Sequence, residues 1–427
     1  MSDERPSLQR PVLDPTRDAR VDATTKGFPA VERPVPLAAV RDQGWTLADL
    51  VPPVLVLRER ALAHNIALMA DYCAAHGVDH VPHGKTTMAP QIWQRQLNAG
   101  AWGVTAATAV QARVMLAAGV RRVVIASEVT DPSAIGWIAA QLHDPDLEIV
   151  CSVDSRGTVE LLAEGLGAVP RPLPVLVELG HDGGRTGCRT VEDALEVAVL
   201  TRNAPGIALA GATGFEGTVC SDRRPACLDE IRAFLDRLGS LAARLRADGL
   251  VETEETWVSA GGSTFFDLVV DHLGAVGGIA DRLLIRSGRY VTHDSGENER
   301  NSPFTGHERD RRFHAAIEAW GAVVSRPERD LAIVNFGRRD VPFDQDLPIP
   351  FSVRDRAGER RGVSGTVIVE RLNDQHAFCR IETELSIEPG DLLGCGVSHA
   401  CTAFDKWRII PVLDDEDRVI DAVATYF

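Results

Sequence analysis

The sequence predicts an α/β protein with two domains, an N-terminal (β/α)8 TIM-like barrel and a C-terminal, mainly antiparallel β domain. Three observations lead to this prediction. The chain has 427 residues, which is long for one compact hydrophobic core. Between residues 80 and 293, short β-branched runs alternate with longer helical patterns, as in parallel sheets whose strands are joined by helices. Beyond residue 293 this alternation ends, and short strand-like runs separated by Gly and Pro turns follow.

Eight short apolar runs are the predicted barrel strands, because strands buried on both faces carry nearly continuous apolar residues. They are His80–His83, Gly103–Ala106, Arg122–Ala126, Glu148–Val153, Leu173–Leu179, Ile207–Ala212, Thr256–Ala260 and Arg282–Arg286. Helical patterns precede or separate them at Glu59–His76, Ala109–Ala118, Ala134–Leu142, Val191–Arg202 and Pro225–Asp248. Asp131 and Ser155 are typical of helix starts. Eight units favour a closed barrel, and a doubly wound open sheet is the alternative.

The predicted boundaries divide the chain into three parts. Residues 1–45 form an N-terminal arm, rich in Pro and charge, that is ordered only where it packs on another element. The barrel spans residues 46–293 and the β domain residues 294–427, although the strand-like segment 51–57 could join the β domain. In the β domain, helical periodicity is predicted only near Arg309–Glu318. Strands are predicted there at Leu331–Asn335, Gly365–Val369, Ala377–Ile381, Ile409–Leu413 and Val419–Val423.

The charge balance argues against several classes of partner. The chain carries 45 Lys and Arg against 61 Asp and Glu, a formal net charge of −16. This leaves no basic surplus to neutralise the phosphates of a nucleic acid or of an anionic membrane. No apolar run reaches the ~18 residues of a membrane span, and the polar N-terminus lacks the apolar core of a signal peptide. We therefore expect a cytoplasmic protein that acts on a small molecule.

Eight cysteines are scattered along the chain without a CxxC pair or a spacing typical of disulfide frameworks. In a cytoplasmic protein we expect reduced thiols, most of them in the core.

In a parallel barrel, the chemistry gathers just past the C-terminal ends of the strands. Past the first predicted strand lies Pro82-His83-Gly84-Lys85-Thr86. A lysine in this place can be desolvated, which lowers its pKa and frees its amine for Schiff-base chemistry. The alternative is an ordinary solvated lysine in a loop.

Glycine-rich loops follow several other predicted strands. Past the fifth strand, Arg185 lies in a loop with four glycines, where its guanidinium could reach a ligand. Past the seventh strand, Gly261-Gly262-Ser263 exposes backbone N–H groups to a phosphate, with a helix expected from Thr264. Past the eighth strand, Tyr290 could flank a flat cofactor ring or pack in the core.

One segment of the β domain carries a candidate metal site. His399 and Cys401 are two residues apart, so on an extended strand both side chains would lie on one face. An imidazole and a thiolate together suit zinc. Two protein ligands are too few for a structural site, but they suit a catalytic metal with open positions. A chance His-x-Cys pair is the alternative.

Together these segments resemble the fold-type III pyridoxal-phosphate enzymes, which are built like alanine racemase. They look most like the D-serine dehydratase / D-threonine aldolase branch, and within it the bacterial D-serine deaminase-like proteins. The resemblance runs from about Val51 to the C-terminus. It rests on five motifs in the family's order, namely Pro82-His83-Gly84-Lys85-Thr86, Gly183-Gly184-Arg185-Thr186-Gly187, Gly261-Gly262-Ser263, Gly288-Arg289-Tyr290-Val291-Thr292-His293-Asp294 and His399-Ala400-Cys401-Thr402-Ala403-Phe404-Asp405-Lys406-Trp407.

The resemblance implies a role for each candidate residue and a homodimeric assembly. Lys85 would be the catalytic residue and would hold pyridoxal phosphate through a Schiff base. Arg185 would lie by the phenolic oxygen of the cofactor and Tyr290 near its pyridine ring. His399 and Cys401 would bind Zn²⁺. The residues implied to bind the phosphate are Gly214, Gly261, Gly262 and Ser263.

Three positions bear on the choice of reaction. The related aldolases usually carry Asp where Cys401 stands, and this departure favours dehydration. Some relatives carry His at the position of Thr87, and many aldolase-like relatives carry His at that of Thr218. If that second His is the aldolase base, its absence weakens the aldolase case.

The expected function is therefore a pyridoxal-phosphate- and zinc-dependent dehydratase of D-3-hydroxy amino acids. Lys85 would take the α-proton and zinc would assist the leaving hydroxide, so that α,β-elimination gives a 2-oxo acid and ammonia. Alternatives are a metal-dependent D-threonine aldolase, which releases glycine and an aldehyde, and a pyridoxal-phosphate homeostasis protein without robust turnover. D-Serine, D-threonine and 3-hydroxyaspartate share the same reacting atoms, so the preferred substrate stays open.

Overall fold

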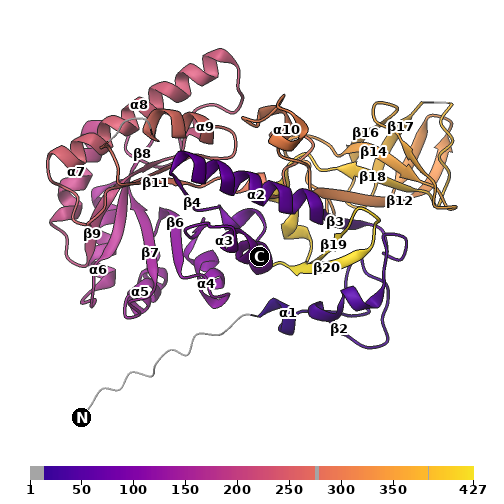
Figure 1. Cartoon of the computed structure of the whole chain (residues 1–427), viewed down its shortest axis with the longest axis horizontal. Coiled ribbons are helices and arrows are strands. Elements are labelled where there is room, and N and C mark those ends of the chain that lie inside the picture. Colours follow the sequence, from indigo (N-terminus) through magenta and orange to yellow (C-terminus); the bar gives the residue numbers. More distant parts are fainter. Residues whose placement is uncertain (1–13, 275–277, 383) are drawn as a thin grey trace, which may run out of the picture.

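The computed structural model of the chain describes residues 14–274, 278–382 and 384–427. Two units lie side by side in Figure 1, a ring of helices and strands on the left and a sheet-rich unit on the right. Residues 1–13 of the predicted N-terminal arm lie outside the described residues. Among the helices that are described, none is long and apolar enough to cross a membrane.

Eight parallel strands form the sheet of the first unit, which confirms the predicted barrel. Their order is β4-β11-β10-β9-β8-β7-β6-β5. The outermost strands of this order, β4 and β5, meet through a parallel bridge between His83 and Thr105, which closes the sheet. The strands are β4 (Asp79–His80), β5 (Val104–Ala106), β6 (Arg122–Glu128), β7 (Glu148–Val153), β8 (Leu173–Leu179), β9 (Ile207–Gly214), β10 (Trp257–Ala260) and β11 (Arg282–Ile285).

Apolar side chains fill the interior of this barrel. One buried cluster contains no helix residue and so belongs to the inside of the sheet; its members are Val81, Val124, Val150, Leu176, Ala210, Trp257 and Leu284. The barrel is therefore a packed core rather than a pore.

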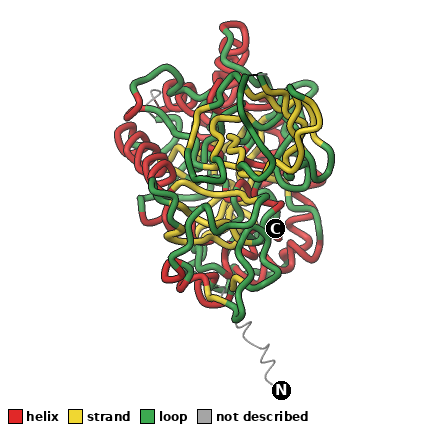
Figure 2. Tube along the Cα trace, turned by 90° about the vertical axis from the view of Figure 1, so that its right-hand side faces the viewer, coloured by secondary structure: helices red, strands yellow, loops and turns green. Residues whose placement is uncertain are grey.

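Helices surround the barrel strands in Figure 1, and Figure 2 shows helices at the left and lower edges of the molecule with strands between them. They are α2 (Glu59–His76), α3 (Pro90–Asn98), α4 (Ala109–Ala117), α5 (Pro132–Gln141), α6 (Arg156–Leu166), α7 (Val191–Arg202), α8 (Pro225–Ala247) and α9 (Phe266–Val269), which continues as a π-helical turn at Val270–Gly274. Side-chain caps fix several of their starts, because an oxygen accepts a backbone N–H that the helix leaves free. Asp131 accepts from Ala134, and Ser155 accepts from Thr158, so both predicted helix starts are confirmed.

The second unit is a mainly antiparallel sheet built around the long strand β12 (Ile317–Glu328). β3 (Val54–Arg58), which precedes the barrel in sequence, pairs antiparallel with β12 and parallel with β19. The other strands are β13 (Leu331–Val334), β14 (Ile349–Arg354), β15 (Arg360–Gly362), β16 (Val367–Leu372), β17 (Ala377–Ile381), β18 (Leu392–Gly396), β19 (Ile409–Leu413) and β20 (Val419–Ala424).

The predicted helical segment Arg309–Glu318 is wrong. The structure has only a single 3-10 turn at Arg309–Arg311, and Ile317 already belongs to β12. Pairing of β12 with β3 and β18 on its two sides overrides the local apolar spacing. The short helix of this region is α10 (Glu297–Asn301) instead.

The described part of the predicted arm packs against the sheet-rich unit. It contains α1 (Pro15–Asp18), β1 (Arg20–Val21) and β2 (Val35–Pro36), and it runs below β20 in Figure 1. Val21, Leu37 and Val40 share one buried cluster with Trp320 of β12 and Val419 of β20. This burial orders the segment, as expected for an arm that packs on another element.

An ion-pair network connects β3 to its neighbours. Arg58, at the end of β3, lies 2.6 Å from Glu318 of β12 and 2.7 Å from Asp417, in the turn between β19 and β20. The side chains of all three residues are more than four-fifths buried. Arg58 therefore compensates two carboxylates that have lost much of their hydration.

We expect Arg58→Met to lower the free energy of unfolding by about 2–4 kcal/mol, because it leaves the largely buried Glu318 without a cation and Asp417 with Arg360 alone. Arg60→Met is the matched control, since the Arg60–Asp415 pair is exposed and should contribute less than about 1 kcal/mol. Urea denaturation of both variants measures the difference. Equal losses in the two variants would contradict the proposed role of Arg58.

Candidate active site

A cavity of about 170 Å³ opens at the C-terminal ends of the barrel strands. Its wall is formed by residues that follow β4, β9, β10 and β11, together with two residues of the sheet-rich unit. Of the residues singled out from the sequence, Lys85, Gly262, Ser263, His399 and Cys401 line the cavity. Arg185, Gly214, Gly261 and Tyr290 are not among its lining residues.

Lys85 lies on a 3-10 turn, Gly84–Thr86, just past β4. The chain has three lysines, and Lys26 and Lys406 are each paired with an aspartate, whereas the amine of Lys85 has no hydrogen bond or ion pair with any described residue. Burial lowers the pKa of Lys85. The charge of Cys401 opposes this shift, and the nearby arginines 185, 286 and 289 reinforce it. This shift raises the share of the amine that is neutral and nucleophilic.

A buried arginine follows β11 and was not singled out from the sequence. The Arg286 guanidinium donates hydrogen bonds to Thr213 Oγ1 (2.8 Å), Ser259 Oγ (2.6 Å) and the Gly214 carbonyl oxygen (2.8 Å). It forms no ion pair with a carboxylate among the described residues, although it lines the cavity. Its charge is thus available to an anionic ligand. Its place at the end of a buried barrel strand could have indicated this role.

The loop after β10 provides backbone N–H groups at the cavity wall. Gly261 has a φ of +91°, a left-handed conformation that favours glycine. The N–H groups of Gly261 and Gly262 donate to the Glu216 carboxylate at 3.1 and 2.6 Å. Those of Ser263 and Thr264 have no acceptor among the described residues.

The helix expected from Thr264 begins later. Phe265 N–H first closes a turn onto the Gly262 carbonyl oxygen, and α9 starts at Phe266. The loop therefore keeps Ser263 and Thr264 in irregular backbone at the cavity wall.

The loop after β11 approaches the Lys85 segment closely. A Cβ atom on Gly288 would lie 2.6 Å from the His83 carbonyl oxygen, so only glycine fits there. The backbone N–H groups of Gly288 and Arg289 are without an acceptor in the described part of the chain. With Ser263 and Thr264 they make four free donors beside Lys85 and Arg286. This donor set fits the phosphate and aldehyde groups of pyridoxal phosphate.

Two residues expected beside the cofactor are not among the residues that line the cavity. The Tyr290 ring is buried outside the cavity, where its hydroxyl accepts a hydrogen bond from Gln96 (2.9 Å) and its ring packs edge-on against His80. Arg185 is exposed, but its guanidinium lies 5.0 Å from the centre of the Phe215 ring, which lines the cavity. Arg185 thus lies at the rim of the cavity, against Phe215. Tyr290 packs in the core behind the cavity wall, against Gln96 and His80.

His399 and Cys401 do face one cavity, but not from an extended strand. His399 precedes a 3-10 turn, Ala400–Thr402, that contains Cys401, so the expectation of an extended strand is wrong. The His399 Nδ1 atom lies 2.6 Å from Asp344, which also accepts a hydrogen bond from Thr402 (2.7 Å). The Cys401 Sγ atom lies 3.5 Å from the Thr86 hydroxyl, beside Lys85.

The electrostatics of this pair favour a thiolate at Cys401. Burial alone would lower the pKa of His399, but Cys401 and Asp344 raise it to about 9. Burial would raise the pKa of Cys401, yet the hydrogen bond from His399 and the charge of Arg289 lower it. A thiolate beside an imidazole held by a carboxylate is a donor set that fits Zn²⁺.

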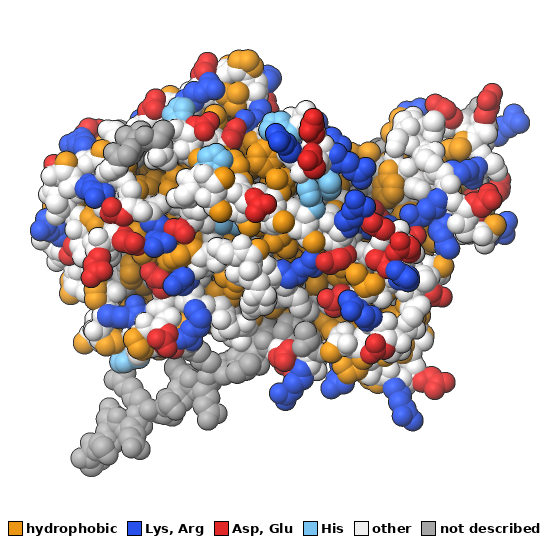
Figure 3. Space-filling model, viewed as in Figure 1, with side chains coloured by type: hydrophobic (Ala, Val, Ile, Leu, Met, Phe, Trp, Pro, Cys, Tyr) orange, Lys and Arg blue, Asp and Glu red, His pale blue; other side chains and the backbone are white. Residues whose placement is uncertain are grey.

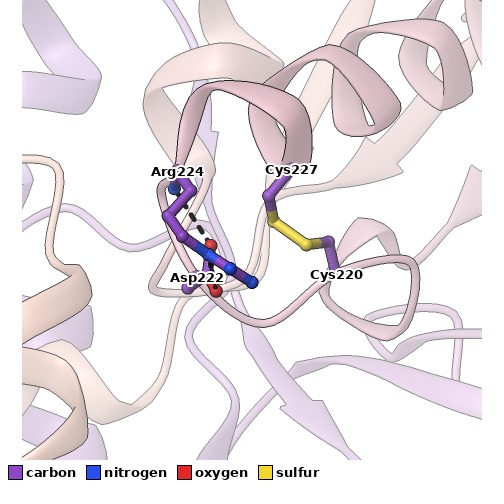
Figure 4. Close-up of a disulfide and its surroundings, with 4 residues drawn as sticks. All are labelled: Cys220, Asp222, Arg224 and Cys227. Carbon is purple, nitrogen blue, oxygen red and sulfur yellow. Dashed lines mark hydrogen bonds and ion pairs between the residues drawn. A yellow bond between two sulfur atoms is a disulfide. The ribbon is translucent and has the colours of Figure 1, made fainter.

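Cys220 and Cys227 form a disulfide, which corrects the expectation that all the thiols are reduced. Figure 4 shows this bond at the start of α8, with Asp222 held by Arg224. These sulfurs and Asp222 form the one group of three potential ligand atoms within 4.8 Å of one another in the described chain, but bonded sulfurs are not thiolates. Cys220 lines the cavity, so the disulfide fixes part of its wall. The free cysteines 73, 151, 188, 379 and 395 are buried, as predicted.

Two carboxyl groups lie at the ends of β6 and β8. Burial, together with the charge of Glu178 and a hydrogen bond to it, raises the pKa of Glu128 to about 8. One oxygen of Glu128 is buried without a hydrogen-bond partner, whereas Glu178 accepts from Thr186 (2.8 Å). Glu128 is therefore favoured in its neutral form.

We expect Glu128→Gln to make the protein less sensitive to alkaline pH. The unfolded carboxyl loses its proton near its ordinary pKa of 4.5, whereas the folded one keeps it up to about 8. The folded wild type thus loses stability as pH rises through this window. At about 1.4 kcal/mol per pKa unit, the variant should gain up to about 4 kcal/mol over wild type at pH 8.5 relative to pH 5. Denaturation at both pH values measures this, and parallel pH profiles would contradict it.

Two family models match the chain. Residues 57–274 match the alanine racemase N-terminal domain, and residues 316–413 match the putative serine dehydratase domain. The first match covers the barrel up to the residues before β11 and includes Lys85, and the second covers most of the sheet-rich unit, with His399 and Cys401.

Three individual proteins illustrate the similarity. The chain is 27% identical to a D-threonine aldolase of Arthrobacter sp over 354 residues, 82% of this chain and 86% of that protein. The crystal structure of D-threonine aldolase from Filomicrobium marinum superposes with a TM-score of 0.75 at 26% identity, covering 90% of this chain and 97% of that one. D-threo-3-hydroxyaspartate dehydratase from Delftia sp. HT23 shares the fold, with a TM-score of 0.69, 21% identity and coverage of 89% and 99%. A mutant dehydratase of that name has been solved in the metal-free form.

Proposed function

This chain belongs to the fold-type III family of pyridoxal-phosphate enzymes, built on the alanine racemase N-terminal domain, and we propose that it is a zinc-dependent dehydratase of D-3-hydroxy amino acids. The products would be a 2-oxo acid and ammonia, so that D-serine would give pyruvate. One observation carries the proposal: His399 and Cys401 line the same cavity as Lys85. A metal-binding pair beside an amine base suits elimination of a hydroxyl group, which a racemase does not need.

The residues of the barrel would bind the cofactor and move the α-proton. When bound, pyridoxal phosphate supplies an electron sink for the charge left on the substrate α-carbon. Lys85 would hold the aldehyde carbon of the cofactor and, once released by the substrate amine, would take the α-proton on its Nζ atom. Arg286 would supply positive charge at the cavity wall, and the free N–H groups of Ser263 and Thr264 would donate hydrogen bonds to the phosphate.

The residues of the sheet-rich unit would hold the metal. Because Asp344 occupies Nδ1 of His399, only Nε2 of that ring is left for a metal ion. Cys401 would be the second protein ligand. A Zn²⁺ ion held there supplies a Lewis acid to the β-hydroxyl of the substrate. The metal-free dehydratase structure is consistent with a metal in this branch.

A D-threonine aldolase is the second candidate, and one contact favours it. The resemblance to aldolases places a histidine where this chain has Thr218, yet the His181 Nε2 atom lies 3.1 Å from the Thr218 hydroxyl. The imidazole of His181, in the loop after β8, thus lies close to the position where the aldolase histidine would stand. Against this candidate stands Cys401, at a position where the aldolases usually carry Asp.

We expect the purified protein to release pyruvate and ammonia from D-serine, and an enzyme-coupled assay measures both. With D-threonine, 2-oxobutanoate supports the dehydratase and acetaldehyde with glycine supports the aldolase.

We expect Lys85→Ala to lose the cofactor absorbance band and to lower kcat by about 10³-fold or more, because the base and the cofactor anchor are both lost. Lys406→Ala, the control, should keep the band. A Lys85→Ala protein with full activity would refute the mechanism.

We expect Asp344→Asn to weaken zinc binding by about 10–100-fold, because His399 loses the carboxylate that fixes its tautomer and orientation. Competition with a chromophoric chelator measures the zinc affinity without reference to activity. Asp346→Asn is the matched control, since Asp346 lies two residues away and its carboxylate pairs with Arg300. Unchanged zinc affinity in Asp344→Asn would exclude this role, as would an equal loss in the control.

A further inference from the structure

A carboxylate of the chain itself occupies two of the backbone donors at the cavity. Glu216 lies on a 3-10 turn, Glu216–Thr218, just past β9, and its side chain is fully buried. Its two oxygens accept hydrogen bonds from the consecutive N–H groups of Gly261 (3.1 Å) and Gly262 (2.6 Å). Consecutive glycine amides at a strand end are an anion site, and here the anion is Glu216.

Packing holds Glu216 in this position. The turn that carries Glu216 is pressed against the β10 loop, since a Cβ atom on Gly262 would lie 2.8 Å from the Phe215 ring. The charge of Glu216 also acts on the buried guanidinium of Arg286, which lacks a carboxylate partner among the described residues. A phosphate that displaced Glu216 would leave a buried carboxylate without donors, and two anions would compete for the same amides.

The β10 loop is held at both ends. Glu216 binds its beginning, and Arg223 binds its end by donating to the Thr264 carbonyl oxygen (2.5 Å) while pairing with Asp267. Between these anchors, Ser263 and Thr264 line the cavity with N–H groups that no described residue accepts. Glu216 thus occupies the N–H groups of Gly261 and Gly262, and it fixes the direction of the N–H groups of Ser263 and Thr264.

We propose that Glu216 is a positioning residue for the cofactor phosphate, acting through the amides of Gly261 and Gly262 to aim those of Ser263 and Thr264 into the cavity. The identity of the ligand rests on the proposed function. The role differs from direct binding, because Glu216 would repel a phosphate placed against it. A positioning role predicts that loss of the Glu216 carboxylate weakens binding of the phosphate group and leaves binding of the rest of the cofactor unchanged.

The test compares pyridoxal 5′-phosphate with pyridoxal, which lacks the phosphate. Cofactor-free wild type and Glu216→Gln are titrated with each compound, and absorbance and tryptophan fluorescence give the two Kd values. A glutamine can accept from one amide but presents its NH2 group to the other, so the loop loses its direction. We expect the Kd for pyridoxal 5′-phosphate to rise about tenfold, and that for pyridoxal to change less than about twofold.

A matched control removes a different buried carboxylate. Glu178 lies at the end of β8 and makes no hydrogen bond to the β10 loop among the described contacts. In Glu178→Gln, the ratio of the Kd for pyridoxal 5′-phosphate to the Kd for pyridoxal should therefore match that of wild type. Glu216→Asp keeps the charge but shortens the side chain. It should shift the ratio in the same direction, and it replaces Glu216→Gln if that variant does not fold.

Three outcomes would overturn the inference. Tighter binding of pyridoxal 5′-phosphate to Glu216→Gln would show that Glu216 competes with the phosphate. An unchanged ratio with lower thermal stability would show a structural role alone, and an equal loss of both affinities would show a general disruption of the site. If wild type itself binds neither compound, the proposed function fails instead, which separates the two hypotheses.

Discussion

The site depends on the parallel pairing of the first and last barrel strands, β4 and β11. Leu284 and Ile285 pair with Asp79 and His80, although about two hundred residues separate them along the chain. The pairing continues as Val81 N–H donates to the Ile285 carbonyl oxygen (2.8 Å). Because parallel strands end at the same edge, the segments that follow β4 and β11 must emerge together. Lys85 is thereby placed beside Arg286 and the free amides of the next loop.

The charge of the site is local and opposite to that of the chain. The net charge is −16, and acidic and basic side chains are interspersed over the face shown in Figure 3. Inside the cavity, three cationic side chains, Lys85, Arg286 and Arg289, face the carboxylates of Glu216 and Glu297. Glu297 pairs with Arg289 and Glu216 is bound by amides, so Lys85 and Arg286 remain unpaired by direct contact within the described chain. Burial strengthens their fields, which explains why the overall charge says little about an anionic cofactor.

Elements with a strong repeating pattern could be predicted from the sequence, and contacts between distant segments could not. The ranges Glu148–Val153, Leu173–Leu179 and Val191–Arg202 match the structure to the residue, because burial on known faces fixes their apolar period. Lys85, His399 and Cys401 could be found because their residue types are rare in such places. Glu216 could not, because its role follows from which donors and acceptors the closed barrel brings together. The position of Arg286 at a strand end was visible in the sequence, but its hydrogen bonds to Thr213, Ser259 and Gly214 were not. The same holds for the Cys220–Cys227 bond, since a separation of seven residues does not by itself indicate a disulfide.

The segment from Gly288 to Glu297 explains how two units make one cavity. At its start, Gly288 lies against the His83 backbone and contributes free amides to the barrel side. At its end, Ser295 N–H donates to the Val397 carbonyl oxygen (3.0 Å) and Glu297 N–H to that of Ser398 (3.2 Å), directly before His399. A short, paired connection leaves His399 and Cys401 little freedom to move relative to Lys85. The proposed dehydration would need both groups on one substrate, so it would depend on this backbone pairing as well as on the identity of the ligands.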